Sequence, residues 1–99
     1  MRWTVVLEKS AEKDLRKAPK HIVITFNVWR LQVIELGLTA VQGNPTWNDR
    51  PKKGKLSHMR SASLNKKYRV IYRVVYHIKD NQIVVEGVSH DYEKIECGY

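Results

Sequence analysis

The sequence predicts one α+β domain over residues 1–99, with two N-terminal antiparallel helices packed on a four-stranded, mainly antiparallel twisted sheet. The main observation is the order of apolar periods along the chain, which runs strand, helix, helix and then three strands. A chain of this length can bury one modest core. Its 42% hydrophobic and 28% charged residues are typical of a folded globular protein, so disorder is not expected.

Residues 2–7 predict the first strand, because apolar and polar positions alternate along them. Ser10 is well placed to cap a short helix, which ends at Ala18 because a proline disfavours helical geometry in the residue before it. The second helix is expected to begin at Pro19 and to stop at Gly37. Its apolar stripe follows helical spacing and consists of Ile22, Phe26, Trp29, Val33 and Leu36.

The C-terminal half of the chain predicts strands. Residues 39–54 contain turn signals and predict a loop, and residues 55–64 predict a strand. From Tyr68 onward the chain alternates, so that tyrosines and valines share one sheet face while Arg69 and Arg73 lie on the other. A polar turn over residues 79–82 leads into the last strand. The apolar face is expected to pack on the helices, and the cationic face needs an anionic partner.

Positive charge is concentrated in one segment of the chain. The formal net charge is +8, and residues 50–79 hold ten Lys or Arg and no Asp or Glu. Such segregation indicates a surface with a polyanionic partner, although a solubilising basic face would have the same composition. A basic membrane helix is disfavoured because this segment has the period of a strand.

Several classes of protein and of site are disfavoured by the sequence. It has no apolar run of about 20 residues that could span a bilayer and no signal-peptide pattern, so a cytoplasmic protein without membrane contact is expected. The single Cys97 excludes an internal disulfide framework. The histidines lack metal-ligand spacing, and neither a phosphate-cradling glycine loop nor a nucleophilic serine elbow is present. We therefore expect no metal and no cofactor.

The remaining candidate chemistry is a set of cations near a histidine and a tyrosine. Cations can neutralise a phosphodiester and its developing negative charge, and His90 or Tyr92 could transfer protons if neighbouring charges tuned their pKa values. The alternative is that His90-Asp91-Tyr92 is an ordinary turn with a packed tyrosine. The cations of interest in or next to the strands are Lys53, Lys55, Arg60, Arg69 and Arg73.

Taken together, the motifs resemble the RelE/ParE superfamily of toxins of type II toxin–antitoxin systems, especially its RelE- and HigB-like members. The resemblance covers nearly the whole chain and implies a RelE-like, microbial RNase-like fold. The features that carry it are Pro19-Lys20-His21-Ile22 with Trp29, the segment Asp49-Arg50-Pro51-Lys52-Lys53-Gly54, Arg60-Ser61, Tyr68-Arg69-Val70-Ile71-Tyr72 and His90-Asp91-Tyr92.

The resemblance also implies an activity, a site and partners. RelE-like toxins enter the ribosomal A site and cleave mRNA with the message's own 2′-hydroxyl as nucleophile, which would make this chain an endoribonuclease that contacts mRNA and rRNA. A cognate antitoxin would neutralise it, and DNA would be contacted only indirectly, through the antitoxin complex. The catalytic residues carried over are Lys53, Arg69, His90 and Tyr92. Further RNA phosphate contacts are expected from Lys52, Lys55, Arg60, Lys66, Lys67 and Arg73.

One position departs from the superfamily pattern. Ser63 stands where many members have an arginine facing the active site, and Arg60 has the wrong strand parity to replace it unless a bulge turns it over. Loss of one such contact could reduce cleavage by about 10²-fold. Two alternatives to a nuclease therefore stay open, a ParE-like toxin that inhibits DNA gyrase and a non-toxic nucleic-acid-binding domain.

Overall fold

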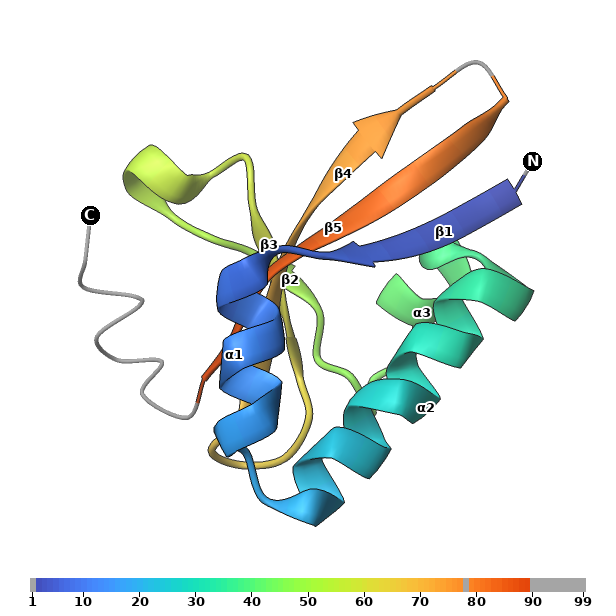
Figure 1. Cartoon of the computed structure of the whole chain (residues 1–99). Coiled ribbons are helices and arrows are strands. Elements are labelled where there is room, and N and C mark those ends of the chain that lie inside the picture. Colours follow the sequence, from blue (N-terminus) through green and yellow to red (C-terminus); the bar gives the residue numbers. More distant parts are fainter. Residues whose placement is uncertain (1, 78, 90–99) are drawn as a thin grey trace.

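A five-stranded sheet in the order β1-β5-β4-β3-β2 forms the frame of the protein (Figure 1). The computed structural model describes residues 2–77 and 79–89. The α+β prediction is confirmed, whereas the prediction of four strands is wrong. The strands are β1 (Arg2–Leu7), β2 (Arg50–Pro51), β3 (Arg60–Ser63), β4 (Arg69–Tyr76) and β5 (Asp80–Ser89).

The fifth strand and the mixed pairing were both beyond the reach of sequence periodicity. β2 has two residues and pairs antiparallel with β3, and a segment this short shows no alternation. β1 pairs in parallel with β5, from Arg2 opposite Asp80 to Leu7 opposite Val85. Parallel neighbours need a long connection, and here every helix and three strands lie between the two in the chain. The first and last strands of the described part of the chain are therefore side by side.

Between β1 and β2 the described chain forms three helices, α1 (Lys9–Lys17), α2 (Lys20–Leu36) and α3 (Leu38–Gln42). The prediction that Ser10 caps α1 is wrong, because Glu8 is the N-cap residue and the Ser10 hydroxyl instead donates to the Glu86 carbonyl at 2.6 Å. Gly37 ends α2 as predicted, with a positive φ of 88° that glycine tolerates. The short α3 lies in the predicted loop. No helix among the described residues is long and apolar enough to cross a membrane.

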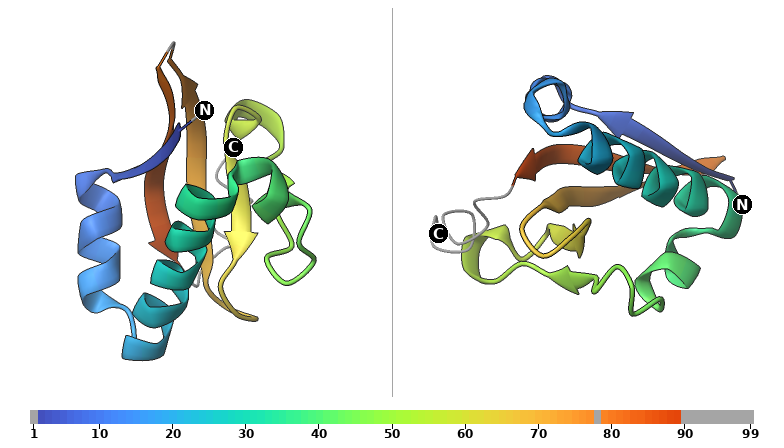
Figure 2. Two further views of the ribbon diagram at one scale, coloured as in Figure 1. Left: turned by 90° about the vertical axis from the view of Figure 1, so that its right-hand side faces the viewer. Right: turned by 90° about the horizontal axis from the view of Figure 1, so that it is seen from below.

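The core lies between the sheet and the helices, with α2 passing over one face of the sheet (Figure 2). The Trp29 ring packs between Phe26 and Tyr72, with ring centroids 5.9 and 5.4 Å away. The prediction that the tyrosine-bearing face of β4 packs on α2 is confirmed for Tyr72, which is fully buried, but Tyr76 lies beyond the helices and is 74% exposed. The described core residues are Ala11, Ile22, Phe26, Trp29, Val33, Leu38, Val41, Trp47, Ala62, Leu64, Val70, Tyr72, Ile83, Val85 and Val88.

A bulge bends β5 against β4. Ile71 is opposite Gly87 and Tyr72 is opposite Val85, which leaves Glu86 as the extra residue on β5. The predicted turn over residues 79–82 is shorter in the structure, since β5 already begins at Asp80. The bulge turns Glu86 toward β4, where its carboxylate contacts an arginine of the predicted site.

Candidate functional site

The predicted phosphate-binding residues gather around β3. A 3-10 turn, η1 (Gly54–Leu56), precedes this strand, so the prediction that the strand begins at residue 55 is wrong. Gly54 has a φ of 66°, which favours glycine at the start of that turn. After β3, the side chain of Asn65 accepts hydrogen bonds from the backbone of residues 67 and 68 and closes a second turn. The lysines on these two turns are all exposed and comprise Lys53, Lys55, Lys66 and Lys67.

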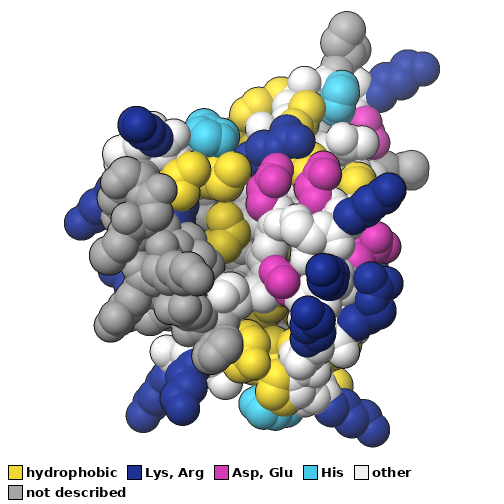
Figure 3. Space-filling model, turned by 60° about the vertical axis from the view of Figure 1, so that its left-hand side comes forward, with side chains coloured by type: hydrophobic (Ala, Val, Ile, Leu, Met, Phe, Trp, Pro, Cys, Tyr) yellow, Lys and Arg dark blue, Asp and Glu magenta, His cyan; other side chains and the backbone are white. Residues whose placement is uncertain are grey.

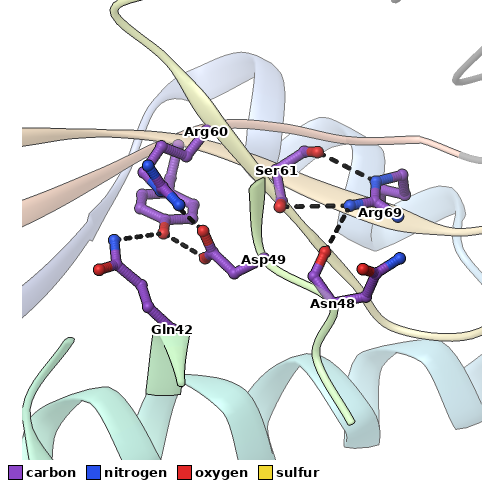
Figure 4. Close-up of polar contacts among 7 residues, drawn as sticks. Gln42, Asn48, Asp49, Arg60, Ser61 and Arg69 are labelled. Carbon is purple, nitrogen blue, oxygen red and sulfur yellow. Dashed lines mark hydrogen bonds and ion pairs between the residues drawn. The ribbon is translucent and has the colours of Figure 1, made fainter. Parts of the chain in front are cut away.

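Arg69 begins β4 and is held inside the protein rather than presented on its surface. Only 5% of the residue is exposed. Its Nε donates to Ser61 Oγ at 3.1 Å, and its Nη2 donates to the carbonyls of Asn48 at 3.0 Å and Ser61 at 3.2 Å (Figure 4). Asn48 has a φ of 44°, a left-handed conformation that asparagine adopts more readily than most residues. The guanidinium therefore has a fixed orientation in this structure.

Arg60 lies on the other face of the sheet. It is directly opposite Tyr72 in the antiparallel pairing, whereas Arg69 is opposite Ser63, and directly opposite residues share a face. Arg60 Nε donates to Asp49 Oδ1 at 2.7 Å, and the Tyr72 hydroxyl donates to the second oxygen of the same carboxylate (Figure 4). The prediction that Arg60 has the wrong strand parity to replace the arginine missing at Ser63 is confirmed, because no bulge in β3 turns Arg60 toward Arg69.

The carboxylate of Asp49 is fully buried, whereas the Arg60 side chain is 32% exposed. Burial, the hydrogen bond to Asp49 and its negative charge raise the pKa of Tyr72 well above its ordinary value, so this hydroxyl stays protonated and able to donate. Burial alone lowers the pKa of Arg60, but the hydrogen bond and charge of Asp49 outweigh it and the pKa is raised. Gln42 Nε2 adds a long hydrogen bond of 3.4 Å to the Tyr72 hydroxyl. We call Gln42, Asp49, Arg60 and Tyr72 the Asp49 network.

Arg73 is also engaged by a carboxylate. Its Nε lies 2.6 Å from Glu86 Oε2, the residue of the bulge, and its Nη2 lies 3.9 Å from Glu8 Oε1. The face in Figure 3 likewise carries acidic side chains among its Lys and Arg side chains. The cationic face that the alternation predicts is therefore partly neutralised by acids that come from other segments of the chain.

Two further positions from the sequence prediction, Lys52 and Ser63, each donate a hydrogen bond to a nearby backbone carbonyl. Lys52 is buried, and its backbone N–H donates to the Met59 carbonyl at 2.9 Å. The Ser63 hydroxyl donates to the Asn65 carbonyl at 2.7 Å, within the turn after β3. Ser63 shares its sheet face with Arg69 but supplies no positive charge there.

His90 and Tyr92 lie outside the described residues. The residue before them in the sequence, Ser89, ends β5 directly opposite Arg69. No group of three or more His, Cys, Asp or Glu side chains among the described residues could hold a metal ion.

The family of the chain follows from its sequence profile. The family described as ParE toxin of type II toxin-antitoxin system, parDE, matches residues 5–94. The chain belongs to the ParE toxin family. It is accordingly a toxin of a type II toxin–antitoxin system. A comparison with curated protein sequences gave no match.

Solved structures show the same fold over nearly the whole chain. The DinJ–YafQ toxin–antitoxin complex of E. coli contains a chain similar to this toxin, with a TM-score of 0.73 at 15% identity, over 94% of this chain and 97% of that chain. A chain of the RelE–RelB complex of Pyrococcus horikoshii OT3 has a TM-score of 0.67 at 23% identity, over 91% of this chain and 96% of that chain. The YoeB/ParE toxin of Agrobacterium tumefaciens has a TM-score of 0.69 at 16% identity, over 88% of this chain and 97% of that chain.

The residues that the sequence reasoning missed in this ParE-family toxin are the partners of the arginines. Asn48 and Asp49 come from the predicted loop, and Glu86 comes from a strand whose bulge was not predicted. The only local signal was the polar, turn-like composition before Arg50. Three of the arginines that the sequence assigns to RNA thus have protein partners.

Proposed function

We propose that this toxin is a ribosome-dependent endoribonuclease that blocks translation by cleaving mRNA in the A site. The observation that carries the proposal is the pairing of Arg69 with Ser89, because it joins two segments far apart in the chain. Arg69 is the arginine predicted to bind the scissile phosphate, and Ser89 directly precedes the segment with His90 and Tyr92. A fixed guanidinium is the kind of preorganised donor that stabilises charge developing on a phosphate.

In the proposed reaction the 2′-oxygen of the message attacks the adjacent phosphorus and the bond to the 5′-oxygen breaks. One group of the pair His90 and Tyr92 takes the proton from the 2′-hydroxyl, and the other donates a proton to the leaving 5′-oxygen. Lys53 and Arg69 stabilise the phosphate as its charge rises. Lys53 is exposed on the turn before β3 and can reach a bound strand without displacing other protein groups.

The exposed lysines around β3 also support a polyanionic partner such as RNA. Lys53, Lys55, Lys66 and Lys67 stand on the two turns that flank β3. Such lysines would contact mRNA and rRNA backbone, with affinity that falls as salt rises. The site of action would be the cytoplasm, and the second protein partner would be a cognate antitoxin, which is present in the similar DinJ–YafQ and RelE–RelB complexes.

The test is inducible expression of wild type and of three single alanine variants, at Arg69, His90 and Tyr92, followed by mapping of mRNA ends. Wild type should arrest growth and produce new cleavage sites in translated messages, and each variant should reduce cleavage at least tenfold. A lysine to alanine change at Lys13, which is exposed on α1 and is not among the residues assigned to the site, is the matched control and should cleave as wild type. Wild-type cleavage by all three variants at Arg69, His90 and Tyr92 would contradict the proposal.

A second candidate is inhibition of DNA gyrase. Two observations favour it: the matching family is described as ParE, and Arg60, Arg69 and Arg73 are each bonded to protein groups. Ser63 in place of a cation points the same way. The same induction experiment separates the two candidates, because a gyrase inhibitor would cause double-strand DNA breaks and leave mRNA intact.

A further inference from the structure

The outer side of α2 is apolar although it faces away from the core. Ile24 is 55% exposed, Val28 45% and Leu31 47%. A surface helix ordinarily carries polar residues on its outer side, and a helix that is apolar on both sides is usually covered on both. The inner side of α2 packs on the sheet through Ile22, Phe26, Trp29 and Val33. In the left view of Figure 2, α2 lies in front of the strands and no other described element is drawn over its outer side.

These exposed residues form a continuous stripe. Their spacing of four and then three residues places Ile24, Val28 and Leu31 on one side of the helix. The same stripe continues by four residues in each direction, to Lys20 at the start of α2 and to Glu35 near its end. Both of these charged residues are exposed. The stripe therefore has a positive end, an apolar middle and a negative end.

We propose that the outer side of α2 is a self-association surface, on which a second copy of this chain docks its own α2 in antiparallel orientation about a two-fold axis. The axis passes beside Val28. In this arrangement Ile24 of one copy lies against Leu31 of the other, and Lys20 of one lies against Glu35 of the other. Each of these contacts occurs twice by symmetry.

The pattern selects a second copy in preference to an unrelated partner because it is complementary to itself. An antiparallel copy matches the apolar middle with an apolar middle and each charge with its opposite. A parallel copy would place like charges together, which is unfavourable. The contact is one helix pair about 22 Å long between the charged residues, from the rise of 1.5 Å per residue. Association of this size should be weak and reversible.

Sedimentation equilibrium of the purified protein at physiological ionic strength tests the proposal. Wild type should change from monomer to dimer between about 1 and 500 μM, as expected for an interface below about 1,200 Å². Val28→Asp places two like charges beside the axis and should weaken the dimer at least about tenfold. Leu31→Glu serves as a second variant if Val28→Asp proves unstable, and thermal unfolding of each variant shows whether the fold is kept.

Charge reversal distinguishes this register from other interfaces. Lys20→Glu and Glu35→Lys should each weaken dimerisation about fivefold, since each creates two like-charge contacts, and the double variant should restore it to within about twofold of wild type. Lys13→Glu on α1 makes the same change in net charge as Lys20→Glu but lies away from the stripe, and it should have no effect. A protein that stays monomeric throughout the range would overturn the proposal, as would a dimer in which the double variant fails to restore association.

Discussion

Replacement of Asp49 by asparagine should destabilise the toxin far more than a typical surface change. The substitution keeps the size of the side chain but removes the negative charge between Arg60 and Tyr72. Asparagine keeps only one acceptor oxygen in place of the two of the carboxylate, and with that oxygen facing Arg60 its NH2 group would face the tyrosine hydroxyl. Arg60 keeps one neutral acceptor and loses its counterion. The result is a partly buried guanidinium without compensating charge.

The size of the effect follows from the burial of the two partners. Breaking a fully buried ion pair costs about 3–5 kcal/mol, and a hydrogen bond to a charged group contributes about 1.5–3 kcal/mol. The Asp49 carboxylate is fully buried, but about a third of the Arg60 side chain is exposed, so water can solvate part of the orphaned charge. We therefore expect Asp49→Asn to lower the free energy of unfolding by about 2–3 kcal/mol.

Urea denaturation, with thermal unfolding as a second measurement, can check this magnitude. For a chain of this length the midpoint temperature should fall by roughly 10–20 °C. The matched control is Glu86→Gln, which breaks the more exposed pair with Arg73 and should cost only about 0.2–1 kcal/mol. The reasoning is refuted if both variants lose the same stability, or if Asp49→Asn stays within about 1 kcal/mol of wild type.

Three further substitutions should separate other features of the fold. Because the pKa of Tyr72 is raised, this hydroxyl keeps its proton in the folded protein at a pH where the unfolded chain loses it, so the free energy of unfolding should fall as pH rises above about 10. Urea titrations at pH 9 to 11 should show a smaller fall for Tyr72→Phe than for wild type, and an unchanged fall for Tyr76→Phe at an exposed position. Gly37→Ala should lower the free energy of unfolding by about 1–2 kcal/mol, because φ is 88° and the new Cβ would lie 3.3 Å from a Trp3 ring nitrogen. Calorimetry can compare it with Gly43→Ala, which has a φ of −79° and should be neutral or stabilising by about 0.4–1 kcal/mol. Arg69→Lys should cost about 1–3 kcal/mol by urea denaturation, because one ammonium cannot satisfy Ser61 Oγ and both carbonyls together.

The elements with strong periodicity were predictable from the sequence. The stripe from Ile22 to Val33 has the spacing of a helix buried on one side, and four of its five predicted positions are buried in the structure. Leu36 is the exception and is exposed, because it lies in the last turn of α2 beyond the edge of the core. Alternation in β4 similarly placed Val70 and Tyr72 on the helix side.

Features that depend on pairing between distant segments were not predictable. Periodicity assigns a strand to residues 2–7 but contains no information on its neighbour, so the parallel pairing with β5 was open. A two-residue strand such as β2 has no period, and a bulge such as that at Glu86 is visible only when two strands are aligned. Ser10 illustrates a related limit: its hydroxyl had two possible partners, and the tertiary contact with β5 prevailed over local capping.

The candidate site was predictable as a set of residue types but not as a set of free charges. Composition identifies cations and cannot show which of them already have anions, because Asp49 and Glu86 reach Arg60 and Arg73 from outside the basic segment. The charge count over residues 50–79 therefore overstates the positive charge that an RNA could meet. Of the predicted phosphate contacts, the lysines on the two turns that flank β3 are exposed and therefore carry the most accessible positive charge.

Two consecutive residues fix arginines on opposite faces of the sheet, which links the Asp49 network to the proposed nuclease site. The Asn48 carbonyl accepts from Arg69 and the Asp49 carboxylate accepts from Arg60. Asn48 directly precedes Asp49 in the chain and holds a left-handed conformation with a φ of 44°. Loosening Asp49 would free that peptide and with it one of the acceptors of Arg69. Asp49, which bonds Arg60 on the other face of the sheet, would thus influence one of the three contacts that orient the arginine proposed to bind RNA.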